Sequence, residues 1–294
     1  MKNYVILTDS CSDLDKADRE KYNIEYIKMH YTIEGLQGEA DLDWGKVSFS
    51  DYYNVMRSGN RIITAQVNES EYEKEFEKHL KSNCDILYIG CSSALSGSVS
   101  ASYVARDKVL KNYKEAKIIC VDSLNASMGL GLLCIGASNL RNQGKTIEEV
   151  GLWVEKQRKF IRQEATVEKL TWLKLAGRVS FASAFFGGIL NVKPIIISDS
   201  NGANVAVEKV KGRKNSLLKI AERCKNAFAN CDMQRVYIVH GDCENDAEEL
   251  KREVEKVLAD NLNLKIEIRP LGPIIGASCG PGTLGLYYFG KEEK

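Results

Sequence analysis

The chain has 294 residues, of which 44% are hydrophobic and 28% are charged, and its formal net charge is +1. A chain of this length and composition can bury the core of one large or two ordinary globular domains, and its near-zero charge argues against the broad basic surface of a nucleic-acid-binding protein. Because no apolar run is long enough to span a bilayer and no signal peptide precedes the first predicted strand, we expect no stable membrane insertion.

In the first half of the chain, short apolar runs that end in polar residues alternate with helical patterns. Strands are predicted at residues 4–8, 24–28, 62–66, 86–89 and 117–121. This alternation through about residue 160 predicts a mostly parallel, Rossmann-like α/β sheet with helices on both faces. Ligands bind beyond the carboxyl ends of the strands in such sheets. The polar strand ends at Asp9-Ser10, Ser92-Ser93 and Asp122-Ser123 are therefore expected to lie along one edge that carries a site.

The most informative stretch is 85–111, where a strand runs into a turn rich in glycine and serine and then into a helix. The first N–H groups of such a helix lack partners within the helix and favour an anion. Ser92 and Ser93 are therefore predicted to belong to a seat for a carboxylate or phosphate, and Thr64, in the lead-in to the preceding helix, could face the same crevice. The alternative is that the serines only cap the helix and that Thr64 is an ordinary loop residue.

The second half, from residue 161 onward, is predicted to form a separate α+β domain. A short helix at 170–176 ends at Gly177, with Arg178 directly beyond it. The aromatic and apolar residues between Phe181 and Leu190 form a surface that either packs in the core or lines a cavity suited to a hydrocarbon tail. A β-hairpin, two helices and two further strands are predicted at 192–198 with 203–210, at 215–228 and 246–258, and at 236–240 and 264–269.

Two catalytic motifs are matched only in part. Residues 144–146 resemble the end of a P-loop, but Asn139 stands where the first glycine of that loop belongs. Residues 276–280 fit the GxSxG pattern of α/β-hydrolases around Ser278, but proline and glycine follow them and every histidine precedes them. We therefore reject the P-loop and disfavour a serine hydrolase. A hydrolase or phosphatase that acts on an acyl or phosphorylated small molecule through the anion seat is kept as the alternative function.

The nine cysteines are odd in number and scattered, and most lie in apolar segments, with no CxxC pair among them. Neither a zinc knuckle nor a thioredoxin-type motif is indicated, and no other metal-ligand spacing is present. We expect a reduced, cytoplasmic protein without a metal or a cofactor.

Several motifs, taken together in their order and spacing, resemble the DegV family of bacterial fatty-acid-binding proteins. The matching segments are Thr8-Asp9-Ser10, Thr64-Ala65-Gln66, 92–98, 121–123, 170–180, 193–195, 240–242, 272–276 and 280–282. The resemblance covers nearly the whole chain and implies two domains, 1–160 and 161–294, with a long-chain fatty acid in the cleft between them. It also implies a FakB-like, non-catalytic carrier that presents the acid to a separate ATP-dependent fatty acid kinase for acyl-phosphate formation.

The resemblance further implies the residues of the site. The carboxylate is expected to be bonded by Thr64 and Ser93, with Ser92 beside them, while the acyl chain runs into an apolar tunnel. Arg178 is expected near the head group or between the domains. One departure concerns Ser278, which stands where the family usually carries a histidine. Because serine offers only a neutral hydrogen bond, we expect this replacement to affect acyl-phosphate handling more than ligand binding.

Overall fold

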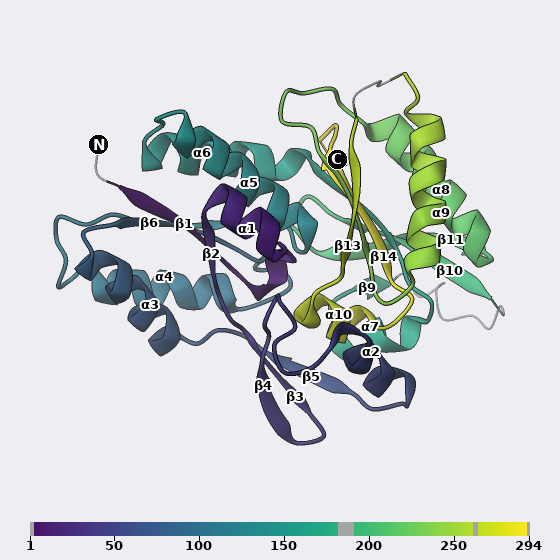
Figure 1. Cartoon of the computed structure of the whole chain (residues 1–294), viewed down its shortest axis with the longest axis horizontal. Helices are drawn as coiled ribbons and strands as arrows, with labels where there is room; N and C mark the ends of the chain where they lie inside the picture. The colour runs from purple at the N-terminus through teal and green to yellow at the C-terminus, as the bar shows by residue number, and fades with distance from the viewer. Residues whose placement is uncertain (1–2, 182–190, 261–263, 293–294) are drawn as a thin grey trace.

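The computed structural model describes residues 3–181, 191–260 and 264–292 of the chain. Its two halves lie side by side in Figure 1, the first built on a parallel sheet and the second on a larger mixed sheet. The predicted apolar surface around Phe185, Phe186 and Ile189 lies outside the described residues. Within the described ranges, no helix is long and apolar enough to cross a membrane.

The parallel sheet of the first half has the strand order β2-β1-β6-β7. Its strands are β1 (Tyr4–Asp9), β2 (Ile24–Ile27), β6 (Asp85–Gly90) and β7 (Ile118–Asp122). Each neighbouring pair runs parallel. The two central strands, β1 and β6, are buried along almost their whole length, as expected for strands covered on both faces. The predicted Rossmann-like arrangement is therefore confirmed.

Five helices cover this sheet. They are α1 (Lys16–Tyr22), α3 (Glu69–Lys81), α4 (Ser98–Val109), α5 (Met128–Asn142) and α6 (Ile147–Gln157). In Figure 1, α1, α5 and α6 lie above the sheet, and α3 and α4 lie below it. Helix α5 is apolar on nearly every side because it packs against strands of both halves, among them β1, β8 and β14.

A small antiparallel sheet, ordered β4-β3-β5, differs from the prediction for this part of the chain. Its strands are β3 (His30–Ile33), β4 (Leu36–Glu39) and β5 (Ile62–Ala65). The sequence placed 62–66 in the alternating pattern and predicted no strand between residues 28 and 62. Instead, Glu34 and Gly35 have φ values of 50° and 82°, which suit a two-residue hairpin turn, and β5 pairs with the hairpin. Helix α2 (Phe49–Arg57) packs on this sheet through aromatic side chains such as Tyr52.

The second half contains a seven-stranded mixed sheet ordered β13-β12-β14-β8-β10-β11-β9. The strands are β8 (Ile161–Thr166), β9 (Ser180–Phe181), β10 (Val192–Ser198), β11 (Asn204–Lys211), β12 (Val236–His240), β13 (Ile266–Pro270) and β14 (Leu284–Phe289). Strand β14 joins β12 to β8, and all six of its residues are buried. The glycine-rich segment before it concealed this strand from sequence reasoning.

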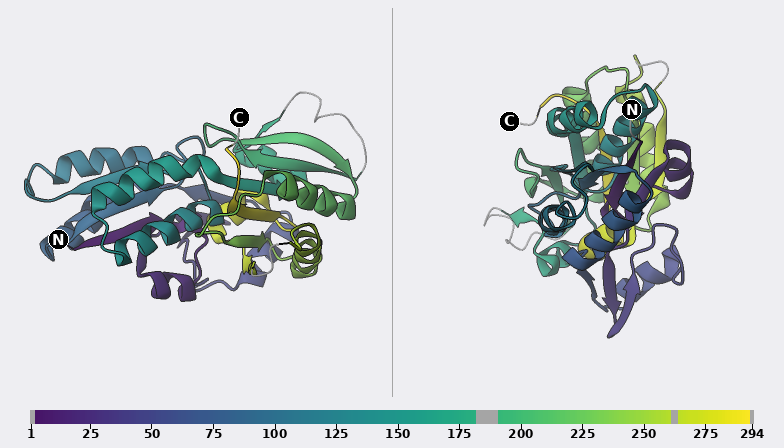
Figure 2. Two further views of the ribbon diagram at one scale, coloured as in Figure 1. Left: turned by 90° about the horizontal axis from the view of Figure 1, so that it is seen from above. Right: turned by 90° about the vertical axis from the view of Figure 1, so that its left-hand side faces the viewer.

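The remaining helices divide between the two faces of the mixed sheet. Helices α8 (Arg213–Ala227) and α9 (Glu244–Val257) pack together on one face, as Figures 1 and 2 show. The short helices α7 (Leu170–Ala176) and α10 (Pro273–Cys279) contact each other beside β5 and α2. Two turns of 3-10 helix, η1 (Ser10–Ser12) and η2 (Arg158–Phe160), complete the described elements. One continuous apolar core runs from the parallel sheet to Val239 and Tyr287 of the mixed sheet.

Candidate functional site

A cavity of about 350 Å³ lies between the two sheets. One wall is formed by four residues that follow the four strands of the parallel sheet: Cys11 after β1, Met29 after β2, Cys91 after β6 and Ala126 after β7. The cavity therefore lies beyond the carboxyl ends of the strands, where the topology predicted a ligand site.

The sulfur groups of this wall are apolar contacts rather than nucleophiles. The Sγ of Cys11 lies 3.3 Å from the Sδ of Met29. A hydrogen bond with Cys91, together with burial, raises the pKa of the Cys11 thiol well above its usual value. A thiol needs to lose its proton to act as a nucleophile, so Cys11 is expected to stay protonated and unreactive at neutral pH.

The floor of the cavity is one face of the mixed sheet. A row of residues opposite one another on β12, β14, β8 and β10 lines it: Val239, Gly285, Ala165 and Ile196. The two middle positions carry no side chain beyond a methyl group, so the sheet surface is hollow there. An apolar hollow bounded by branched aliphatic side chains suits a hydrocarbon chain.

Next to this row, the polar side chains of the floor bond to one another. The hydroxyl of Tyr287 donates to Oε1 of Gln163 at 3.3 Å, and Nε2 of Gln163 donates to Oδ1 of Asn204 at 2.9 Å. All three residues line the cavity. Because their polar groups have partners within the protein, they can border an apolar ligand without leaving a buried group unsatisfied.

Helix α10 forms a third wall with Ile274, Ile275 and Ser278. Two fully buried tyrosines of α2 hold the start of this helix, since the Tyr53 hydroxyl donates to the carbonyl of Leu271 at 2.9 Å and the Tyr52 hydroxyl to that of Pro273 at 2.6 Å. A Cβ atom at Gly276 would lie 2.3 Å from the Tyr53 hydroxyl oxygen. Close packing therefore explains the first glycine of the GxSxG match, and Ser278 lies in the last turn of a helix instead of at a strand-to-helix elbow.

Asp13 joins the elements around α10. Its Oδ2 accepts a hydrogen bond of 2.6 Å from the hydroxyl of Ser127, which precedes α5. Its Oδ1 packs against Gly272, which precedes α10, where a Cβ atom would lie 2.3 Å from this oxygen. Burial raises the pKa of Asp13 to about 7. This carboxyl group thus links η1, α5 and α10 next to the cavity and titrates near neutral pH.

Polar side chains gather at the mouth of the cavity. Thr64 and Gln66 come from β5 and its end, Ser96 from the turn after β6, Arg178 from the end of α7 and Ser278 from α10. Thr64, Arg178 and Ser278 also line a small adjoining pocket of about 40 Å³, so they lie close together. Arg178 is exposed and donates hydrogen bonds to the backbone carbonyls of Ala176 at 2.5 Å and Leu95 at 3.4 Å.

The lining carries very little charge. Of the described residues that line the cavity, Arg178 alone is charged, and none is a histidine, aspartate or glutamate. A single cation at the mouth of an otherwise neutral cavity can accompany one carboxylate. The same lining offers Ser278 no side chain that could act as a general base.

The predicted site residues do not all meet in the cavity. Thr64, Arg178 and Ser278 line it, whereas Ser92 and Ser93 are directed elsewhere. Ser92 is fully buried and its hydroxyl donates to the carbonyl of Gly202 at 2.8 Å, which fixes the β10–β11 hairpin against this turn. Ser93 is exposed, and its backbone N–H donates to Oδ1 of Asp122 at 3.2 Å.

The turn presents Ser96 and Gly97 to the cavity instead, and sequence reasoning did not single out these residues. The backbone N–H of Ser96 donates to the carbonyl of Ser92 at 3.0 Å, so the chain makes one helical turn between them. Sequence reasoning named Gln66 only as part of the Thr64-Ala65-Gln66 segment, without a role in the site. Its side chain packs on Gly97, where a Cβ atom would lie 2.2 Å from Oε1. Two segments that are far apart in the sequence therefore meet at the cavity, Thr64-Ala65-Gln66 and Leu95-Ser96-Gly97.

The chain is similar to proteins of one family along nearly its whole length. The family model described as "Uncharacterised protein, DegV family COG1307" matches residues 3–291. A DegV domain-containing protein of Clostridium perfringens is 34% identical over 295 residues, covering 100% of both chains. A DegV lipid-binding protein of Thermotoga maritima, known from its crystal structure, is 26% identical with a TM-score of 0.84 and covers 99% of this chain and 100% of its own. A fatty-acid-binding DegV-family protein from Thermus thermophilus has the same fold, with 24% identity, a TM-score of 0.84 and coverage of 99% and 100%.

Proposed function

Because this chain belongs to the DegV family, we propose that it binds a long-chain fatty acid with the acyl chain in the cavity and the carboxylate at its mouth. The observation that carries the proposal is the lone charge of Arg178 in a lining that is otherwise neutral among the described residues. The similar Thermotoga maritima protein is a lipid-binding protein, which agrees with this chemistry.

The energetics favour an amphiphile with one charged head. Burial of about ten methylene groups contributes on the order of 8 kcal/mol, at about 0.8 kcal/mol each. The head group fixes the orientation of the ligand, because a carboxylate drawn into the apolar cavity without hydrogen-bond partners would be costly. We place the carboxylate among Thr64, Ser96, Arg178 and Ser278, with Gln66 supporting the turn that carries Ser96. In this arrangement Ser92 holds the hairpin and Ser93 faces solvent.

We further propose that the protein is a carrier and not an enzyme, and that a separate ATP-dependent kinase phosphorylates the bound acid. The described lining has no acid or base for hydrolysis, so the alternative of a hydrolase or phosphatase has no support from this cavity. Arg178 is exposed and Ser96 is half-buried, so a second protein could reach the head group. A reducing, cytoplasmic environment suits the nine cysteines, since no disulfide bond joins them in the described part of the chain.

Mass spectrometry of lipid extracted from the purified, heat-denatured protein tests the proposal. We expect a long-chain fatty acid, and its absence, together with no binding of added fatty acid, would contradict the assignment. The site itself is tested by the double variant Thr64→Ala with Ser96→Ala, which should lose most of the bound acid because two donors to the carboxylate are removed. Ser93→Ala is the matched control and should retain it.

The single variants Ser93→Ala and Ser96→Ala separate the two possible seats for the carboxylate. If Ser93→Ala empties the cavity while Ser96→Ala does not, the carboxylate lies at the seat implied by the family resemblance. A hydrolase and phosphatase screen addresses the alternative function. Turnover that disappears in Ser278→Ala would favour an enzyme over the carrier.

A further inference from the structure

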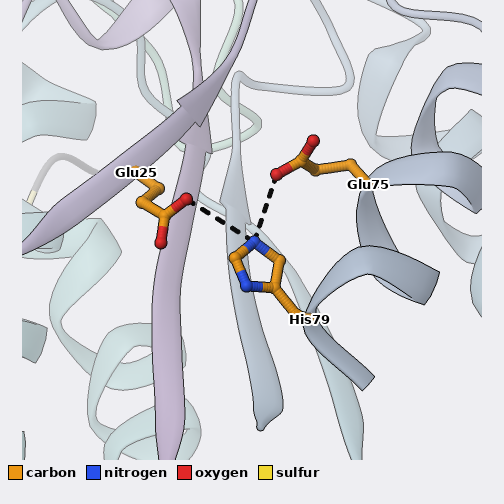
Figure 3. A group of neighbouring side chains, drawn as sticks. All are labelled: Glu25, Glu75 and His79. Atoms are coloured by element: carbon orange, nitrogen blue, oxygen red, sulfur yellow. Dashed lines mark hydrogen bonds and ion pairs between the residues drawn. The ribbon is translucent and has the colours of Figure 1, made fainter. Parts of the chain in front are cut away.

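A second group of polar side chains lies outside the cavity lining, between the edge strand β2 and helix α3. It consists of Glu25 of β2 with Glu75 and His79 of α3, shown in Figure 3. The Nε2 atom of His79 lies 3.1 Å from Oε1 of Glu75 and 3.7 Å from Oε2 of Glu25. One potential ligand atom from each residue falls within 4.8 Å of the other two.

The 3.1 Å separation of the His79 and Glu75 ligand atoms is close to that in the coordination shell of a small divalent ion. Zinc binds imidazole nitrogen and carboxylate oxygen at about 2.0–2.2 Å, so neighbouring ligand atoms of a tetrahedral site lie about 3.3 Å apart. Glu75 and His79 are four residues apart on one helix and therefore share a face. Small side-chain adjustments would bring the Glu25 oxygen to the same separation.

His79 is held in place for this role. The residue is only 7% exposed, and its Nε2 is directed between the two carboxylates, as Figure 3 shows. The Nε2 atom of His79 is within hydrogen-bond distance of Oε1 of Glu75, which keeps these two ligand atoms next to each other on α3. We propose that Glu25, Glu75 and His79 form a binding site for a divalent transition-metal ion such as Zn²⁺, with a fourth position open to water.

Lys78 would compete with the ion for the carboxylates of Glu25 and Glu75. Its ammonium group lies 2.6 Å from Oε1 of Glu75 and 3.5 Å from Oε2 of Glu25, the same two oxygens that approach His79. The Lys78 side chain is 60% exposed, so it can turn into solvent when the ion binds. The metal would then link the last turns of α3 to the exposed edge of the parallel sheet. The imidazole selects a transition metal over Mg²⁺, which prefers oxygen ligands.

Titration of the tag-free, chelator-treated full chain with Zn²⁺ against a zinc indicator tests the site. The exposed thiol of Cys231 could bind zinc on its own, so every protein in the series carries Cys231→Ser. We expect one equivalent to bind, and Glu25→Gln or His79→Gln to weaken binding by about tenfold or more, since each removes a ligand. Lys78→Met should tighten binding, which a purely structural ion-pair network would not do.

His30→Gln is the matched control, because His30 contacts a single carboxylate, that of Glu71, at 2.6 Å. Its zinc affinity should equal that of the parent. Absence of stoichiometric binding in the parent, or equal binding by His30→Gln and Glu25→Gln, would overturn the proposal. Glu25 is exposed, so Glu25→Gln is expected to fold and decides the outcome even if His79→Gln does not fold. Displacement of Zn²⁺ by equimolar Mg²⁺ would also overturn it.

Discussion

Enlarging the side chain at Ala165 should shorten the acyl chain that the cavity accepts. Ala165 lies in the hollow middle of the cavity floor, between Gly285 on β14 and Ile196 on β10. Replacement by leucine adds three carbon atoms that point into the space proposed for the ligand. Each added carbon displaces roughly one methylene group of a long acyl chain.

The size of the effect follows from the free energy of burial. Three methylene groups returned to water cost about 2.4 kcal/mol, at about 0.8 kcal/mol each, which weakens binding of the longest acids about 60-fold. An acid shorter by about three carbons never filled that space, and its affinity should change little. The preferred chain length therefore shifts downward by about three carbons in Ala165→Leu.

Competitive displacement of a fluorescent fatty acid, with a series of saturated acids of increasing length, measures this shift. Val207→Leu is the control, because Val207 lies on β11 of the same sheet, beyond β10, and is 43% exposed to solvent. It should leave the whole series unchanged. Equal chain-length profiles for Ala165→Leu and the parent would refute the assignment of this cavity to the acyl chain.

Two further predictions concern buried carboxylates. Burial raises the pKa of Asp13 from 3.8 to about 7. Between these pH values the folded protein keeps a proton that the unfolded chain has lost. The free energy of unfolding should therefore fall as the pH rises from about 4 to 7 and level off above pH 7. From pH 5 to pH 7 the loss is about 2 kcal/mol, and Asp13→Asn should lack it in denaturant titrations; equal pH slopes in both proteins would contradict this. Glu164 is fully buried, 3.2 Å from Arg162 and 2.5 Å from Arg223. Its replacement by alanine should lower the free energy of unfolding by about 3–5 kcal/mol, because it removes a buried carboxylate that pairs with two guanidinium groups. The exposed Glu222→Ala should cost less than about 1 kcal/mol in the same titration, and similar losses for both would show that the buried network contributes little.

Much of the fold could be predicted from the sequence because it rests on local patterns. The apolar runs at Tyr4–Asp9 and Asp85–Gly90 and the helical stripes between them predicted the parallel sheet. Strand β5 was assigned to the wrong sheet, since its partner depends on the hairpin turn at Glu34 and Gly35 and not on its own sequence. Strand β14 was missed because glycines before it suggested an irregular tail.

The candidate site was predictable to the extent that it follows strand ends and family motifs. Thr64, Arg178 and Ser278 were identified by the resemblance, and all three line the cavity. The choice among the serines of the turn after β6 was not predictable, because it depends on a helical turn and on a contact between Ser92 and Gly202 of a distant hairpin. The cluster around His79 escaped notice for a similar reason, since Glu25 comes from a different element.

The walls of the cavity come from segments that are far apart in the chain, with Cys11 and Met29 on one side and Gly285 and Tyr287 on the other. The ribosome must therefore finish translating β14 before the cavity can close. Until then the nascent chain would expose the apolar surfaces that pack against β14 in the folded protein. A ligand that binds only the completed cavity favours the folded state by mass action. Under the proposed function, the supply of fatty acid and the yield of folded protein should therefore be coupled in the cell.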